Sequence, residues 1–305
     1  MRIVVHGQQA FGRAVLERLV ERGEDVVGAF CAPDREGRPD DPLKEFALEK
    51  GLTLHQPASW KTDEAAALMG SFAPDLCVMA YVTLFVPQPV LDAPKLGTIQ
   101  YHPSLLPLHR GPSSINWPIM QGETKTGLTI FWPDEGLDEG PVLLQKEVKI
   151  ATDDTLGSLY FNQLFPMGVA AMVEAVDLVR DGAAPRVEQD HSQATYESWC
   201  RKSDAEIDWS KPALEVYNLI RGTNPQPGAW TIVGGNELKV FDCSPAEASG
   251  AAGEVAAISE EGFTVACGEG GLLVRRVRPH DGGKVPASEY VSGAGLAVGA
   301  RLGTG

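Results

Sequence analysis

The feature that most constrains the fold is an alternation of strand-like and helix-like segments through the first half of the chain. Residues 2–6 form a short apolar run, and residues 11–22 follow with apolar side chains at helical spacing. A second strand-like run at 25–30 leads, through a loop rich in Pro and Gly, to another helical pattern at 43–50. Strands separated by helices of this length are typical of a doubly wound sheet, so we predict an α/β, Rossmann-like domain with a mostly parallel sheet.

The same alternation continues as far as residue 180. A long helix is expected over residues 155–180, with Asp153 or Asp154 near its N-cap. Further strands are predicted at 52–55, 75–80, 97–101 and 128–132, with 143–150 as an edge hairpin partner.

The pattern changes after residue 180. Residues 181–208 are polar and without a clear period, which indicates a linker. Five short strand-like runs follow, and they predict a small β-barrel of the OB-like type. We therefore expect a catalytic domain at 1–185, a linker at 186–207 and a C-terminal β-barrel domain at 208–305. The Gly- and Ala-rich tail after Val291 is expected to be poorly ordered. The five runs are 229–233, 238–241, 253–258, 263–267 and 272–277.

Charge and composition exclude several classes of protein. The formal charge of −15 argues against non-specific binding to nucleic acid or to an anionic membrane. No apolar stretch approaches the roughly 20 residues of a membrane span, and the first strand leaves no room for a signal peptide, so we expect a cytoplasmic protein. The five cysteines are scattered without a CxxC pair, so the sequence predicts neither disulfides nor a metal site.

The glycine loop GQQAFG (residues 7–12) stands between the first strand and the first helix, where dinucleotide folds bind pyrophosphate. Gln9 occupies the place of the middle glycine of that fingerprint, and its side chain would obstruct the close approach of a phosphate. No acidic residue that would bind a ribose ends the second strand. A structural turn is therefore favoured over an NAD(P) site, and an NAD(P)-dependent oxidoreductase stays a minor alternative.

Gln100 and His102 form the first candidate site. Alternate residues of a strand share one face, so the two side chains point the same way. Pro103 ends the hydrogen-bonded ladder and leaves both at the carboxyl end of the sheet, where ligands of α/β folds bind. Taken alone, one histidine in a loop is more often structural than catalytic.

The acidic loop DEGLDEG (residues 134–140) follows the predicted strand at 128–132, at the same edge of the sheet. Taken alone, it would be interpreted as an acidic surface turn. A carboxylate beside an imidazole, however, fixes the tautomer of the ring and stabilises its charged form. Together the two stretches predict a proton-transferring centre.

These two motifs resemble the signature of the folate-dependent formyltransferase family. HPSLLPLHRG (102–111) and DEGLDEG are accompanied by further motifs in the family's order, so the resemblance covers nearly the whole chain. It is closest to the hydrolase domain of 10-formyltetrahydrofolate dehydrogenase, and the chain is also similar to methionyl-tRNA formyltransferase. The further motifs are SINW (114–117), IFW (130–132), LLQKE (143–147), ATY (194–196) and PGAW (227–230).

The resemblance implies that 10-formyltetrahydrofolate is the formyl donor and that no metal is needed. His102 and Asp138 would be the catalytic pair. Most family members carry Asn two residues before this histidine, and here Gln100 keeps the amide donor on one extra methylene; the dehydrogenase hydrolase domain also lacks that Asn. The folate is expected to lie against the segment after the strand at 75–80 and against the acidic loop. Its predicted contacts are Met79, Ala80, Tyr81, Val82, Leu84, Phe85, Asp134, Glu135, Gly136 and Leu137.

The formyl acceptor stays open between a small amine and water. Residues 206–305 contain 8 Lys and Arg against 12 Asp and Glu, a balance of 8 − 12 = −4, which disfavours transfer to an initiator tRNA. Small-molecule substrates are therefore predicted, with formyl transfer to a small amine first and 10-formyltetrahydrofolate hydrolysis as the alternative. A catalytically inactive folate-binding protein is a further alternative, suggested only by Gln100. The sequence carries no indication of oligomeric state.

Overall fold

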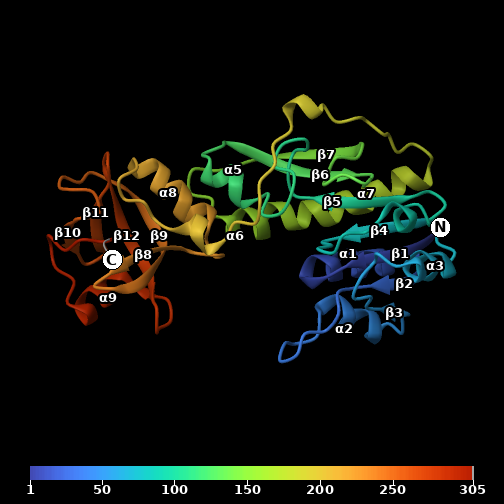
Figure 1. Ribbon diagram of the computed structural model, residues 1–305, viewed down its shortest axis with the longest axis horizontal. Helices are drawn as coiled ribbons and strands as arrows, with labels where there is room; N and C mark the ends of the chain where they lie inside the picture. Colours follow the sequence, from blue (N-terminus) through green and yellow to red (C-terminus); the bar gives the residue numbers. More distant parts are fainter. Residues whose placement is uncertain (304–305) are drawn as a thin grey trace. The chain divides into compact units, whose positions relative to one another are not determined.

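The computed structural model describes residues 1–303 and divides into two compact units (Figure 1). The first consists of residues 1–111, 127–148 and 161–196. The second contains 112–126, 149–160 and the chain from residue 197 onward. Each unit has its own hydrophobic cluster and is described by itself. The sequence boundaries at residues 185 and 208 stay predictions.

The first unit is built on a seven-stranded sheet in the order β3-β2-β1-β4-β5-β6-β7. The five strands from β3 to β5 pair in parallel, and β6 pairs antiparallel with β5, which confirms the predicted mostly parallel α/β fold. Its central strands are continuous apolar runs because helices cover both faces of the sheet. The strands are β1 (Arg2–Gly7), β2 (Asp25–Phe30), β3 (Leu54–His55), β4 (Leu76–Ala80), β5 (Thr98–His102), β6 (Lys125–Phe131) and β7 (Val142–Lys149).

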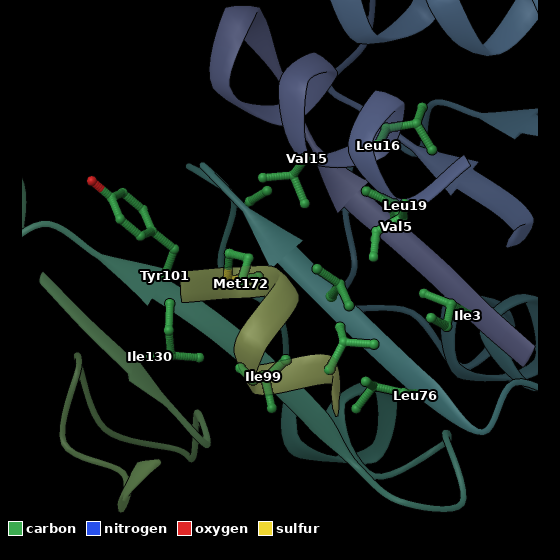
Figure 2. Close-up of a cluster of buried hydrophobic side chains, with 14 of the residues drawn as sticks. Ile3, Val5, Val15, Leu16, Leu19, Leu76, Ile99, Tyr101, Ile130 and Met172 are labelled. Atoms are coloured by element: carbon green, nitrogen blue, oxygen red, sulfur yellow. The ribbon is translucent and has the colours of Figure 1, made fainter. Parts of the chain in front are cut away.

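Two hydrophobic clusters fix the helices to this sheet. Figure 2 shows the larger one, in which Val15 and Leu19 of one helix and Met172 of another lie with strand residues such as Ile99. A separate cluster around Trp60 and Met69 includes alternate strand residues such as Val4, so it lies on the opposite face. The first cluster takes residues from α1 (Gln9–Glu21), α2 (Pro42–Glu49) and α7 (Phe165–Arg180), and the second from α3 (Asp63–Ser71) and α4 (Gln88–Leu91).

The single long helix expected at 155–180 was wrong in detail. The segment contains α6 (Leu156–Leu159), a π-helical turn (Tyr160–Leu164) and then α7. Thr155 is the N-cap, because its hydroxyl accepts from Ser158 N (3.1 Å) while Ser158 Oγ accepts from Thr155 N (2.9 Å). Asp154 lies next to it, as expected, and its carboxylate accepts from Ser158 Oγ and from Ala151 N, both at 2.8 Å.

The second unit contains the predicted antiparallel sheet, in the order β10-β11-β12-β9-β8, with β13 beside β12. In the part of the chain that the structure describes, its strands are β8 (Ala229–Val233), β9 (Asn236–Ala246), β10 (Val255–Ser259), β11 (Gly262–Ala266), β12 (Gly271–Pro279) and β13 (Val285–Pro286). Its helices are α5 (Asn116–Met120), α6, α8 (Ala213–Gly222) and α9 (Ala287–Ala294), with a 3₁₀ turn (Lys202–Ala205); another 3₁₀ turn (His191–Gln193) belongs to the first unit.

The expectation of a poorly ordered tail was wrong for the described residues after Val291. They complete α9 and then form a segment that joins the two outer strands of the sheet path. Leu302 N donates to Gly253 O (2.8 Å), and Gly303 N donates to Ile232 O (2.9 Å). Leu302 is also buried, at 3% exposure, so both backbone pairing and apolar burial hold the segment in place. The tail thus closes the sheet between β8 and the start of β10, as an OB-like barrel requires.

Within residues 1–303, none of the helices has both the length and the apolar character that crossing a bilayer requires.

Candidate active site

The site begins at the carboxyl end of β5. The strand ends at His102, because Pro103 has no N–H with which to continue the ladder. Gln100 and His102 lie two residues apart and both approach Asp138, as the alternation predicts. His102 is buried, whereas Gln100 is half-buried and pairs with Met79 of β4.

The two ring nitrogens of His102 have different partners. Nε2 lies 2.8 Å from the carbonyl oxygen of His109, and a carbonyl only accepts, so Nε2 carries the hydrogen. Nδ1 faces Asp138, with 3.6 Å between Nδ1 and Oδ2. The nitrogen available for proton transfer is therefore Nδ1, on the side of the carboxylate.

Asp138 is held in an uncommon conformation at the end of the acidic loop. Its φ is +57°, a region that costs a non-glycine residue about 1 kcal/mol or more. Oδ2 accepts a hydrogen bond from Gly111 N at 2.9 Å, and the side chain is only 8% exposed. Gly140 permits the tight return of the loop, because a Cβ there would lie 1.8 Å from Trp132 O. The loop is thus a fixed support for one carboxylate.

Gln100 directs its amide toward the same carboxylate. Its Nε2 donates to Asp138 Oδ1 over 3.5 Å, a long hydrogen bond. An amide nitrogen carries two hydrogens, so one N–H remains for another oxygen. This geometry is compatible with the predicted role in stabilising an oxyanion.

Sequence reasoning missed the buried cation beside the pair. Arg110 is 1% exposed, and its contacts are mainly with neutral groups. Nε and Nη2 donate to Gln189 Oε1 at 3.1 and 2.7 Å, while Nη1 donates to the Tyr196 hydroxyl. Nη2 also lies 3.2 Å from His191 Nδ1, and Glu139 is 3.9 Å from Nη1. The guanidinium therefore connects the segment 189–196 to the HRG tripeptide.

Gln189 was also missed. It stands in the stretch predicted as a linker, and nothing in the local pattern marks it. The side chain is buried, and Nε2 donates to the carbonyl oxygens of Asp138 (2.9 Å) and Gly140 (2.7 Å). The bridge between Val142 and Val187 fixes the approach of this segment to the sheet.

The predicted folate-binding residues fall into two groups. Met79 and Ala80 are buried within β4, so their side chains lie in the hydrophobic clusters. Beyond the strand, Tyr81 and Phe85 are 45% and 55% exposed, and Leu137 of the acidic loop is 56% exposed. Val82, Leu84, Asp134 and Gly136 are half-buried, and Glu135 is exposed. Exposed aromatic and aliphatic side chains of this kind suit the flat ring of a folate, and the contact assignment stays a prediction.

The glycine loop has a structural explanation. A Cβ on Gly7 would lie 2.4 Å from Ala80 O, so the glycine allows β1, α1 and β4 to approach closely. The backbone donors of the loop are also used internally. Gln8 N donates to Ala80 O, and Gln9 N donates to both carboxylate oxygens of Asp41 at 2.9 Å. The position of a pyrophosphate is thus taken by the protein's own carboxylate.

His6, near the end of β1, is a buried histidine outside the His102–Asp138 pair. It packs 4.8 Å from the Trp60 ring, and its Nδ1 has no hydrogen-bond partner among residues 1–303. Burial lowers the pKa of His6 from 6.5 to about 3, so the ring is neutral at physiological pH. Over the same residues, no group of three or more His, Cys, Asp or Glu side chains is placed to hold a metal ion.

Comparison with known proteins places this geometry in a family context. The family model described as formyl transferase matches residues 1–176, and the formyl transferase C-terminal domain matches residues 200–295. The cytosolic 10-formyltetrahydrofolate dehydrogenase of Xenopus tropicalis is 40% identical over 98% of this chain, which spans 35% of that protein. The methionyl-tRNA formyltransferase of Trichlorobacter lovleyi is 36% identical, with 99% of this chain and 96% of that protein covered. The chain thus spans about a third of the length of the curated dehydrogenases that it matches.

Solved structures share the fold at lower sequence identity. HypX from Aquifex aeolicus in complex with tetrahydrofolic acid gives a TM-score of 0.69 at 22% identity, covering 98% of this chain and 48% of that one. WlaRD, a sugar 3N-formyl transferase, also gives 0.69, at 18% identity, with coverages of 92% and 98%.

Proposed function

The chain belongs to the formyl transferase family, and from that premise we propose that it transfers the formyl group of 10-formyltetrahydrofolate to a small amine. The observation that carries the proposal is the paired placement of His102 and Asp138 at the end of β5, with Gln100 beside them. Such a centre can take a proton from a nucleophile and return it to a leaving nitrogen.

The roles of the residues follow from their contacts. Because Nε2 of His102 donates to the His109 carbonyl, Nδ1 is the atom that accepts the proton lost by the attacking amine. Asp138 stabilises the imidazolium that forms. The free N–H of Gln100 donates to the formyl oxygen as it becomes negatively charged. When the bond from the formyl carbon to the folate nitrogen breaks, the proton passes from Nδ1 to that nitrogen.

Water is the second candidate acceptor. The 40% identity to a 10-formyltetrahydrofolate dehydrogenase, over 98% of this chain, is the observation that supports it. With water, the same proton transfers would release formate and tetrahydrofolate.

A tRNA acceptor is not proposed, although one relative is a methionyl-tRNA formyltransferase. Residues 206–305 have the net balance of −4 given above, and the basic run Arg275, Arg276 and Arg278 lies in β12. Within that run, the Nε atom of Arg275 is paired with Glu261 at 3.1 Å. A surface with this charge is a poor match for a polyanion.

We also propose that the protein acts in the cytoplasm.

Turnover of 10-formyltetrahydrofolate by the purified protein, followed by absorbance with and without a panel of small amines, tests the proposal. Turnover only in the presence of an amine supports transfer and identifies the acceptor class. Turnover without amine that is lost in Asp138→Asn supports the hydrolase instead. Folate binding without turnover under any condition contradicts both and favours an inactive binding protein.

A further inference from the structure

The tripeptide His109-Arg110-Gly111 contacts the catalytic pair at two points. The carbonyl of His109 accepts from His102 Nε2, and the N–H of Gly111 donates to Asp138 Oδ2. Both partners of the proton-transferring pair are therefore positioned by one short segment of backbone. The tripeptide fixes only the carboxylate of Asp138, however, and leaves the backbone of the acidic loop to be held from elsewhere.

Gln189 provides that second support. Its Nε2 donates to the carbonyl oxygens on both sides of Glu139, those of Asp138 and Gly140. Among the contacts given above, these two hydrogen bonds are the ones that hold the Asp138 backbone at its positive φ. A loop in such a conformation persists only when its surroundings hold it there.

Arg110 fixes which way the Gln189 amide points. A guanidinium has donors only, so the oxygen of the amide must face it and the NH₂ group must face the loop carbonyls. The contacts thus form a closed circuit from Arg110 through Gln189 to Asp138 and back through Gly111.

We propose that Gln189 is a positioning residue that sets the Asp138 carboxylate against Nδ1 of His102, acting through its hydrogen bonds to the loop backbone. The inference rests on the proposed function, because the pair it positions is the one assigned to proton transfer. Displacing a reacting group by about 1 Å can cost on the order of 100-fold in rate, so support of this kind has a measurable effect.

The variant Gln189→Glu separates positioning from simple stability. A glutamate keeps an oxygen acceptor for Arg110 and adds an ion pair, but it removes both donors to the loop. We expect kcat to fall about 10- to 100-fold, with KM for the folate changed less than twofold and with a shifted pH profile of kcat. Gln189→Met removes the same donors without adding a charge and also removes the acceptor of Arg110, so it should lower kcat at least as much, which keeps the test valid if Gln189→Glu fails to fold.

Gln193→Glu is the matched control. It makes the same change on the same segment, but Gln193 is exposed and its Nε2 donates to the neighbouring Ser192 Oγ, at 3.4 Å. Its kcat should equal that of the wild type. Wild-type kcat in folded Gln189→Met would overturn the inference.

A second measurement does not depend on turnover. The ¹⁵N resonances of the His102 ring, assigned by their loss in His102→Ala, should move in Gln189→Met and stay fixed in Gln193→Glu. Wild-type protein without turnover would contradict the proposed function, and the resonances would still decide the inference about Gln189. Unmoved resonances would overturn it.

Discussion

The carbonyl oxygen of His109 accepts a hydrogen bond from Nε2 of His102 at 2.8 Å, and this contact decides which ring nitrogen faces the chemistry. His109 itself has a φ of +55°, and its own N–H donates to Thr195 Oγ1 at 2.8 Å. The uncommon backbone conformation of His109 therefore directs its carbonyl toward Nε2 of His102, and Nδ1 faces Asp138.

Removing either member of the pair should nearly abolish turnover. We expect Asp138→Asn and His102→Ala each to lower kcat by about 10³-fold or more, because the amide cannot stabilise an imidazolium and alanine cannot take a proton. The measurement is steady-state turnover of 10-formyltetrahydrofolate, with circular dichroism to verify the fold. A rate like that of the wild type in either variant would contradict the assignment.

Gln100 is expected to contribute through its free N–H. Gln100→Leu removes the donor at similar volume and should lower kcat about 10²- to 10³-fold, the usual effect of losing an oxyanion donor. Gln100→Asn retains an amide and should lose less. If Gln100→Leu and the wild type turn over equally, the oxyanion is stabilised by another group.

Because the pKa of the buried His6 is lowered, we expect the protein to lose stability in acid. Its pKa is about 3 in the folded protein against 6.5 when unfolded, so between these values the unfolded chain binds the additional proton. Stability from this group is complete above pH 6.5 and falls as the pH decreases toward 3, by about 3 kcal/mol between pH 7 and pH 4. Urea unfolding at both pH values measures it. His6→Leu should flatten the dependence, whereas the exposed His280→Asn should leave it unchanged.

Asp41 caps two elements at once. Its carboxylate accepts from Leu43 N at the start of α2 and from Gln9 N at the start of α1. Asp41→Ala should therefore lower the free energy of unfolding by about 1–2 kcal/mol. The control is Asp40→Ala, which loses only an exposed ion pair with Lys44 and should cost less than about 0.5 kcal/mol.

Because Asp41 occupies the backbone donor of Gln9 in the glycine loop, titration of the wild type with NADPH should show no binding. A saturable binding signal would support the oxidoreductase alternative.

Leu302 tests the closure of the barrel. Leu302→Ala should lower the stability of the second unit by about 2–4 kcal/mol, because the side chain is 3% exposed. Val298→Ala, in the same tail but 61% exposed, should change it by less than about 0.5 kcal/mol. If Leu302→Ala lowers the free energy of unfolding as little as Val298→Ala does, measured by chemical denaturation, burial of Leu302 does not stabilise the closed sheet.

Much of the fold could be predicted because it depends on local periodicity. The strand and helix patterns of residues 2–50 required only the apolar spacing, and Pro103 located the end of β5. The tail could not be predicted in this way. A segment rich in Gly and Ala shows little local preference for a helix or a strand. The order at Leu302 comes instead from backbone pairing with residues far away in sequence.

The residues of the candidate site also differ in how far local sequence patterns predicted them. His102 and Asp138 belong to compact motifs, and the spacing of Gln100 and His102 already predicted a shared face. Gln189 gave no signal, because a polar residue in an aperiodic stretch looks like surface. The apolar run that predicted β4 places the side chains of Met79 and Ala80 in the core, and their contact with the folate stays a prediction.

The buried guanidinium of Arg110 has a consequence for how the enzyme responds to its medium. Its side chain is fully shielded from solvent, and the neighbouring carboxylate of Asp138 is nearly so. Dissolved ions screen surface charges over about 10 Å at 0.1 M, but they screen interior charges much less. Dissolved ions therefore weaken the electrostatic field at Nδ1 of His102 only slightly, and kcat should be nearly independent of ionic strength.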